Sequence, residues 1–216
     1  MLLSLIKKEF VLEFRQKSTL GGVLVYLAGT IFVSALCFKG HLDKPTWNAL
    51  FWVITLFTSV TISGKSFLKE TGGQGLFNYL HYPARQFIVA KILYNMVFML
   101  ILSFLTFFFY ALFIKNEVEN ISLFLLVLLL ASTGLAGVLS LMSAIAAKAN
   151  GNFAMMSILS FPVVMPLILV VIRLSKQAVD GLEWAGVGFD FISILVALNV
   201  LTLALSFLLF PYLWRD

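Results

Sequence analysis

The sequence predicts an all-α, polytopic membrane protein with six transmembrane helices and both termini in the cytoplasm. The composition, the charge-free runs and the distribution of basic residues support this fold class. Of the 216 residues, 61% are hydrophobic and 12% are charged, whereas soluble domains are about half apolar and one quarter charged. This composition excludes an ordinary soluble domain.

Six runs without any Asp, Glu, Lys or Arg divide the chain. They are residues 18–38, 45–64, 92–114, 121–147, 153–172 and 191–212. A helix needs roughly 20 apolar residues to cross about 30 Å of hydrocarbon, and every run reaches or approaches that length. We therefore expect one transmembrane domain, residues 18–213, with helices at about 18–38, 45–64, 88–114, 121–147, 153–172 and 190–212.

The placement of basic residues predicts the orientation. With the N-terminus inside, ten of the 15 Lys and Arg residues fall in the inner segments 1–17, 65–91, 148–152 and 213–216. Cytoplasmic loops carry such an excess of Lys and Arg. The net charge of +5 is therefore a signal of topology, and no nucleic-acid partner is expected.

The first 17 residues interleave apolar side chains with Lys7, Lys8, Glu9, Glu13 and Arg15. A basic amphipathic helix before a membrane span usually lies in the plane of the lipid headgroups. We expect residues 1–17 to form such an interfacial helix. A simple membrane anchor is the alternative.

The stretch SVTISGKS, residues 59–66, matches a phosphate-binding loop except that Ser59 replaces the first glycine. A working phosphate loop follows a strand and opens a helix, whose N-terminus faces the phosphates. Here the expected second helix precedes the motif, so the negative end of that helix would face the anion. We expect no nucleotide site in this stretch.

The polar segment at residues 65–87 follows the second predicted helix. It is basic, contains Gly72, Gly73 and Gly75, and includes Pro83. Residues 75–82, GLFNYLHY, have apolar side chains at helical spacing, which is typical of a short interfacial helix. Such an element could dock a cytoplasmic motor. A plain connecting loop is the alternative.

Small and polar residues mark the fourth predicted helix. Ser132, Ala136, Ser140 and Ala144 recur every four residues, a pattern that lets helix backbones approach closely in lipid. The partner helix could belong to this chain or to a second copy. Asn95 and Asn199, deep in other helices, predict interhelical hydrogen bonds.

The fifth predicted helix carries Pro162 and Pro166 on one face. Each proline removes a backbone donor and distorts the helix. Ser157 and Ser160 are candidates to satisfy the freed carbonyls. The kink could line a gate, or it could be structural only.

After this helix, residues 173–191 are expected outside the cell, as an interfacial element or a surface loop.

Three stretches resemble one family of membrane proteins. LIKKEFVLEFRQKSTL, ALFWVITLFTSVTISGKSFLKE and SILSFPVVMPLILVVI are similar to the basic N-terminal helix, the second helix and the fifth helix of the heme exporter protein B (CcmB) family. These are permease-type subunits of ABC exporters with six helices. In such permeases the cytoplasmic segment between helices two and three engages the ATPase, and its acidic, Gly, Pro and Lys positions would fall here on Glu70, Gly75, Pro83 and Lys91. Lys69, beside Glu70, is a further candidate for coupling.

The resemblance implies a subunit without catalytic activity in the bacterial inner membrane. Its partners would be an ATP-binding subunit similar to CcmA, membrane subunits similar to CcmC and CcmD, a heme chaperone similar to CcmE, and a second copy of this chain. Heme would be a cargo of the complex rather than a bound cofactor. His41 could ligate heme iron, or it could be a surface residue. The alternatives are an exporter of lipid, glycan or peptide, and a membrane protein without a motor.

Overall fold

The computed structural model describes residue 11 and residues 17–39, 42–68, 84–148, 153–182 and 188–215. These residues form the helices α2 (Lys17–Cys37), α3 (Lys44–Leu68), α5 (Ala84–Phe113), α6 (Ile121–Lys148), α7 (Phe153–Val179) and α8 (Phe189–Arg215). The same residues contain no strand. The predicted all-α class is confirmed.

Helices α3, α5, α6, α7 and α8 contain apolar segments long enough to cross a membrane. The segments are Lys44–Ser63, Val89–Phe113, Ile121–Ala147, Ala154–Val179 and Phe189–Leu209. The apolar part of α2, Gly21–Cys37, is shorter, although the whole helix has 21 residues. The lengths and compositions of these helices confirm a polytopic membrane protein.

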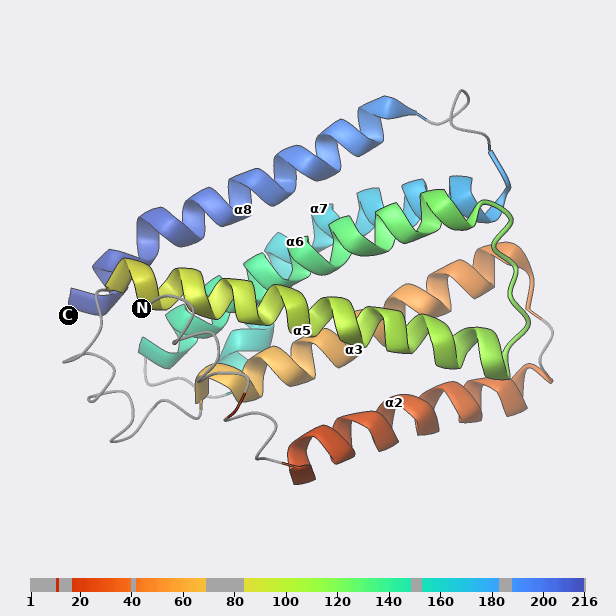
Figure 1. Ribbon diagram of the computed structural model, residues 1–216, viewed down its shortest axis with the longest axis horizontal. Helices are drawn as coiled ribbons and strands as arrows, with labels where there is room; N and C mark the ends of the chain where they lie inside the picture. The colour runs from red at the N-terminus through yellow and green to blue at the C-terminus, as the bar shows by residue number, and fades with distance from the viewer. Residues whose placement is uncertain are drawn as a thin grey trace.

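Helix α6 is the centre of the bundle and packs against α3, α5, α7 and α8 (Figure 1). Its side chains at Leu123, Val127, Ala131 and Leu135 are fully buried. A helix that is apolar on all sides can pack neighbours around its whole circumference, and α6 has this character. The other helices are therefore arranged around it.

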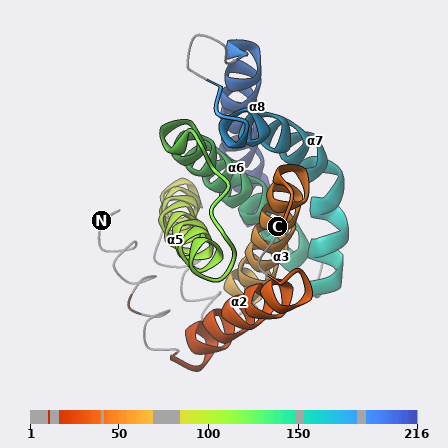
Figure 2. The ribbon, with the colours of Figure 1, turned by 90° about the vertical axis from the view of Figure 1, so that its right-hand side faces the viewer.

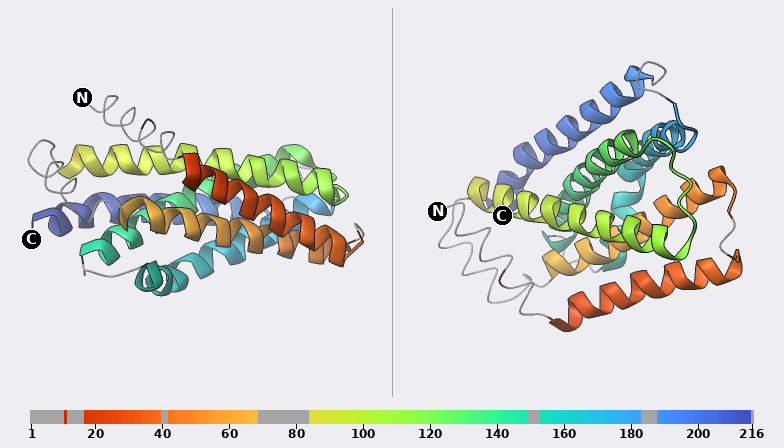
Figure 3. Two further views of the ribbon diagram at one scale, coloured as in Figure 1. Left: turned by 90° about the horizontal axis from the view of Figure 1, so that it is seen from below. Right: turned by 45° about the vertical axis from the view of Figure 1, so that its right-hand side comes forward.

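Helices α2 and α8 lie on opposite sides of the bundle (Figures 1 and 3). Helix α2 packs on α3 and α5 through Val23, Leu27 and Ile31, which are buried and recur every four residues. On its other side Val25 is 73% exposed and Val33 is 57% exposed. Helix α2 is thus attached along a single stripe.

Helix α7 continues to Val179, beyond the predicted end at residue 172. Residues 173–179, which were expected to belong to an interfacial element or a surface loop, instead continue the helix. The N–H of Leu182 donates to Gln177 (3.0 Å) and that of Gly181 donates to Ala178 (3.4 Å), while Gly181 has a φ of 77°. This is a Schellman ending. The glycine ends the helix, whereas Arg173 does not.

Helix α6 begins with a side-chain cap that also holds the end of α7. Asn120 Oδ1 accepts the N–H of Leu123 at 3.1 Å, and Asn120 Nδ2 donates to the carbonyl of Leu182 at 2.8 Å. The N–H of Asn120 donates to the Ala178 carbonyl at 3.0 Å. One asparagine therefore satisfies groups that both helix ends leave open.

Helix α3 has an acidic cap. Asp43 accepts a hydrogen bond from the N–H of Thr46 at 3.4 Å, and bonding to Thr46 lowers the pKa of the Asp43 carboxyl. The next residue, Lys44, pairs with Glu119. The start of α3 is thus fixed to the connection between α5 and α6.

Residues 59–66, which resemble a phosphate loop, lie inside α3. Ser59 donates its hydroxyl to the Thr55 carbonyl at 2.8 Å, one turn earlier in the same helix. The N–H groups of a helix interior are already bonded and cannot cradle a phosphate. The conformation of this stretch is therefore that of a helix and not that of a phosphate-binding loop.

Candidate functional site

The predicted coupling residues Lys69, Glu70, Gly75 and Pro83 lie outside the described residues. So do His41 and, apart from residues 11 and 17, the predicted interfacial helix 1–17. The helices on either side of the coupling segment are described. Helix α3 extends to Leu68 and α5 begins at Ala84, so both ends of the predicted segment 65–87 are helical.

Lys91, which the resemblance aligns with the lysine of the coupling pattern, lies in α5 and is only 2% exposed. A buried ammonium group must interact with groups inside the protein, and Lys91 does have such an interaction within this chain. In this conformation its side chain does not offer a surface to another subunit. The aligned role of Lys91 in direct docking is therefore not supported.

The two predicted prolines lie on the exposed face of α7. Pro162 and Pro166 are exposed. Phe161, just before Pro162, is 59% exposed, and Met165, between the two prolines, is 41% exposed. Helix α7 changes direction along its length (Figures 2 and 3). Because the prolines lack N–H groups, the carbonyls four residues earlier, of Ile158 and Pro162, lose their usual donors.

Ser160 does not serve the carbonyl that Pro162 releases. Its hydroxyl donates to the carbonyl of Ser157 at 2.9 Å, one residue before Ile158. A serine in a helix reaches back three or four residues, and at three residues this geometry selects Ser157. The predicted role of Ser160 in satisfying a carbonyl freed by proline is therefore wrong.

A hydrogen-bonded group joins α3 to α7 at the end of the bundle where α3, α6 and α8 begin, here called the distal end. Trp52 Nε1 donates to Ser175 Oγ at 2.8 Å, and Ser175 Oγ donates to Asn48 Oδ1 at 2.8 Å. Asn48 Nδ2 in turn donates to the Ile172 carbonyl at 3.0 Å. All three side chains are buried. Each bond therefore satisfies a polar group that water cannot reach.

Aromatic side chains extend this group toward α5. Trp47 Nε1 donates to the Lys115 carbonyl at 3.0 Å, and the Tyr110 hydroxyl donates to the Trp47 carbonyl at 3.1 Å. The ring centroids of Trp47 and Tyr110 are 5.0 Å apart, and Phe51 packs on both. Aromatic pairs contribute about 0.5–1.5 kcal/mol beyond the burial of area. We call Trp47, Asn48, Trp52, Tyr110 and Ser175 the distal clasp.

The distal clasp was not predicted from the sequence. Asn48 and Trp52 are four residues apart and so share one face of α3, which is the signal that could have indicated a polar contact there. Their partner Ser175 follows Arg173, in a part of the chain that was expected to be an interfacial element or a surface loop rather than part of α7. The error in the end of α7 therefore hid the contact.

Farther along the bundle, polar contacts join α5 to α6 as predicted. Asn95 Nδ2 donates to Ser140 Oγ at 2.7 Å, and Ser132 Oγ donates to Ser103 Oγ at 2.9 Å. The stripe of small residues on α6 is thus a packing surface, and these two of its serines contact α5 of the same chain. The prediction of an interhelical bond for Asn95 is confirmed.

Asn199 of α8 makes the second predicted interhelical contact. Its Nδ2 donates to the Leu130 carbonyl at 3.1 Å, and its Oδ1 accepts from Thr133 Oγ1 at 3.0 Å. The backbone of α6 comes close here because position 134 is a glycine, and a Cβ there would meet Leu167 and Asn199. The close approach of α6 to α7 and α8 depends on that missing side chain.

Comparison with known protein families now identifies the chain. The family model for the CcmB protein matches residues 1–212, which include all six described helices except the last residues of α8. The chain belongs to the CcmB family. CcmB proteins are permease-type membrane subunits of the ABC complex that exports heme during cytochrome c maturation. The resemblance seen in the sequence is confirmed, and no curated protein matches the chain.

The described residues of this CcmB-family chain contain no group of three or more His, Cys, Asp or Glu side chains that could hold a metal ion. The candidate elements in these residues are the helix ends beside the predicted coupling segment, the distal clasp, and the exposed prolines of α7.

Proposed function

We propose that this chain couples ATP hydrolysis by a separate subunit, similar to CcmA, to heme export or to the release of a heme-loaded chaperone similar to CcmE. The family match over residues 1–212 carries this proposal, because it spans the membrane helices together with the predicted coupling segment. The chain itself would contribute no catalytic group. Heme would be a cargo of the complex.

Helix α3 supports a route from the motor to α7. At one end α3 leads into the coupling segment, and at the other end it forms the distal clasp with α7 through Asn48, Trp52 and Ser175. A tilt of α3 would therefore move α7 as well, because buried hydrogen bonds and packed rings resist sliding. We propose that the coupling segment acts on α7 by this path.

Pro162 and Pro166 would let α7 respond by bending. They lie between the start of α7 at Phe153 and its attachment at Ser175. The two prolines remove two backbone hydrogen bonds about one turn apart, and this loss makes the helix easier to bend there than elsewhere. In this proposal the clasped part of α7 follows the tilt of α3. The part of α7 before the prolines then changes its angle relative to the clasped part.

The distribution of basic residues supports an arrangement of the chain in the cell. The bias of Lys and Arg favours a cytoplasmic location for both termini and for Lys69, Glu70, Gly75 and Pro83. The distal clasp would then face away from the cytoplasm, in the inner membrane of a bacterium. We propose a homodimer that associates with the ATP-binding subunit and with membrane subunits similar to CcmC and CcmD.

The test begins with deletion of the gene and measurement of c-type cytochromes. We expect these to be lost, and to return with the wild-type gene. The double variant P162A and P166A should assemble at normal levels but restore cytochrome maturation poorly, since a straighter helix resists bending. Ile158→Ala, on the same exposed face, is the matched control and should restore it fully. Normal cytochrome levels in the deletion strain would refute the function.

The coupling segment is tested separately by ATPase activity in the purified complex. Glu70→Lys combined with Gly75→Val should lower ATPase stimulation while the chain remains folded in the membrane. Glu70→Lys alone should have a partial effect, because exposed charge pairs contribute only up to about 1 kcal/mol. Unchanged ATPase activity and assembly in the combined variant would show that another segment couples the motor.

A further inference from the structure

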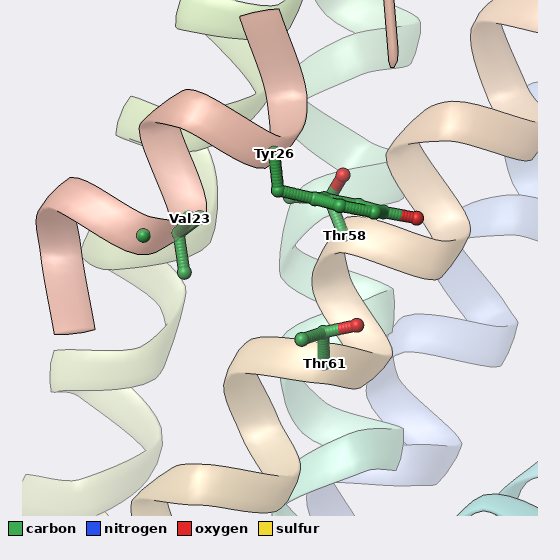
Figure 4. Close-up of a pocket in the computed structure, with 5 residues that line it drawn as sticks. Val23, Tyr26, Thr58 and Thr61 are labelled. Atoms are coloured by element: carbon green, nitrogen blue, oxygen red, sulfur yellow. The ribbon is translucent and has the colours of Figure 1, made fainter. Parts of the chain in front are cut away.

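A cleft opens between α2 and α3. Its volume is about 160 Å³, and it is lined by Gly22, Val23, Tyr26, Thr58 and Thr61. Figure 4 shows the Tyr26 ring extending from α2 across the gap toward α3, with Thr58 behind it and Thr61 one turn farther along α3. The cleft borders the side of the bundle where α2 is attached by a single stripe.

The cleft lies within the apolar parts of both helices, toward the end of the bundle opposite the distal end. At a rise of 1.5 Å per residue, Tyr26 is about 8 Å from the start of the apolar part of α2 at Gly21, and Thr58 is about 8 Å from the end of the apolar segment of α3 at Ser63. Hydrocarbon about 30 Å thick surrounds a transmembrane helix. The material available at this depth is therefore lipid acyl chain rather than headgroup or bulk water.

The walls of the cleft favour an apolar occupant. Thr58 Oγ1 donates to the Ile54 carbonyl and Thr61 Oγ1 donates to the Phe57 carbonyl, each at 2.8 Å. Both hydroxyl protons are thus used within α3. The threonine oxygens can still accept hydrogen bonds, but most of the exposed wall of the cleft is apolar. The wall therefore suits an apolar occupant better than water.

Gly22 leaves the space that defines the cleft. A Cβ built at Gly22 would meet no atom within 4 Å, although Val23, the next residue, is buried against the bundle. A dry cavity of about 150 Å³ holds one benzene molecule, so the present volume accommodates a short section of a hydrocarbon chain. A second helix, about 10 Å across, is too wide to enter.

We propose that this cleft binds the acyl chain of a membrane lipid, inserted between α2 and α3. The chain would fill the space beside Gly22 and pack against the Tyr26 ring, and the rest of the lipid would follow the exposed face of α2. A bound chain would supply the contacts that α2 lacks on this side. The inference does not depend on ATP coupling or on the cargo of the complex.

The experiment uses the complex reconstituted into vesicles of phosphatidylethanolamine and phosphatidylglycerol. A small fraction of the lipid carries a photoreactive diazirine midway along one acyl chain. After illumination, mass spectrometry locates the lipid adducts. We expect adducts at Tyr26 and its neighbours in the cleft to exceed those at Val33, which is simply exposed on α2.

Gly22→Leu should fill the cleft and reduce the Tyr26 adducts to the level at Val33. Gly29→Leu is the matched control, because Gly29 also has no atom within 4 Å of a Cβ but lies outside the cleft, and it should leave the adducts unchanged. Thr61→Leu narrows the cleft from the α3 side and repeats the test if Gly22→Leu does not assemble. Adducts at Tyr26 no higher than at Val33, or a crosslink from the cleft to another subunit, would overturn the proposal.

Discussion

The glycines of α6 and α2 serve opposite purposes. In α6 a Cβ at Gly134 would meet Leu167 and Asn199, and one at Gly137 would lie 3.3 Å from Thr202 Oγ1. In α2 a Cβ at Gly22 or Gly29 would meet no atom within 4 Å. The central helix uses glycine to bring neighbours close, whereas the peripheral helix has glycine where the described residues provide no neighbour.

This difference teaches that a small residue in a membrane helix has no single meaning. Close approach of backbones is the usual interpretation of small residues in lipid, and it holds for Gly134. A third use appears at Gly181, where a φ of 77° suits glycine regardless of the space around it. Substitutions at these positions should therefore differ in their effect on stability. The order of these effects tests the comparison.

The largest effect is expected for Gly134→Leu. The new side chain must occupy space already filled by Leu167 and Asn199, and overpacking typically costs about 1–3 kcal/mol. We expect a marked fall in the thermal unfolding temperature of the purified protein in detergent. Gly134→Ala should give a smaller fall, since it adds only one methyl group. No change with Gly134→Leu would show that α6 and α7 are not closely packed.

An intermediate effect is expected for Gly181→Ala. A residue with a Cβ in the left-handed region costs about 1–2 kcal/mol, and here the methyl group would also meet Glu119. The unfolding temperature should fall, and the ion pair between Lys44 and Glu119 should weaken. Asp180→Ala, at the exposed neighbouring position, is the control. Equal stability of the two variants would contradict the assigned ending of α7.

The smallest effect is expected for Gly29→Ala. The methyl group meets no atom within 4 Å, and replacing glycine within a helix can stabilise it by roughly 0.5–1 kcal/mol. The unfolding temperature of the isolated chain should stay the same or rise slightly. A fall as large as that of Gly134→Leu would erase the contrast between α2 and α6. The same measurement on the assembled complex would reveal a partner packed on this face.

The positions of the helices could be predicted because a membrane leaves few alternatives. Long charge-free runs must be helical there, since unbonded backbone groups are too costly in hydrocarbon. Asn95 and Asn199 were predictable for the same reason, because a deep amide needs a partner. The end of α7 was missed because Arg173 and Lys176 were read as marking an outer loop, whereas the left-handed Gly181 determines the actual end.

The candidate site was less predictable than the fold. Pro162 and Pro166 identify a point of bending, but the sequence does not say that they face outward. The distal clasp depends on contacts between residues more than one hundred positions apart, as for Trp52 and Ser175. No local pattern encodes such a pair. The coupling residues Lys69, Glu70, Gly75 and Pro83 remain predictions.

The extension of α7 to Val179 also relates the protein to the thickness of its bilayer. With 27 residues at 1.5 Å each, α7 is about 40 Å long, against about 30 Å of hydrocarbon. A helix that exceeds the bilayer must tilt, bend or project from it. The bend of α7 takes up part of the excess, and Arg173 and Lys176 can place their charges among the headgroups. Membranes of different thickness would therefore favour different angles of α7, so lipid chain length would act directly on the helix that we propose to move.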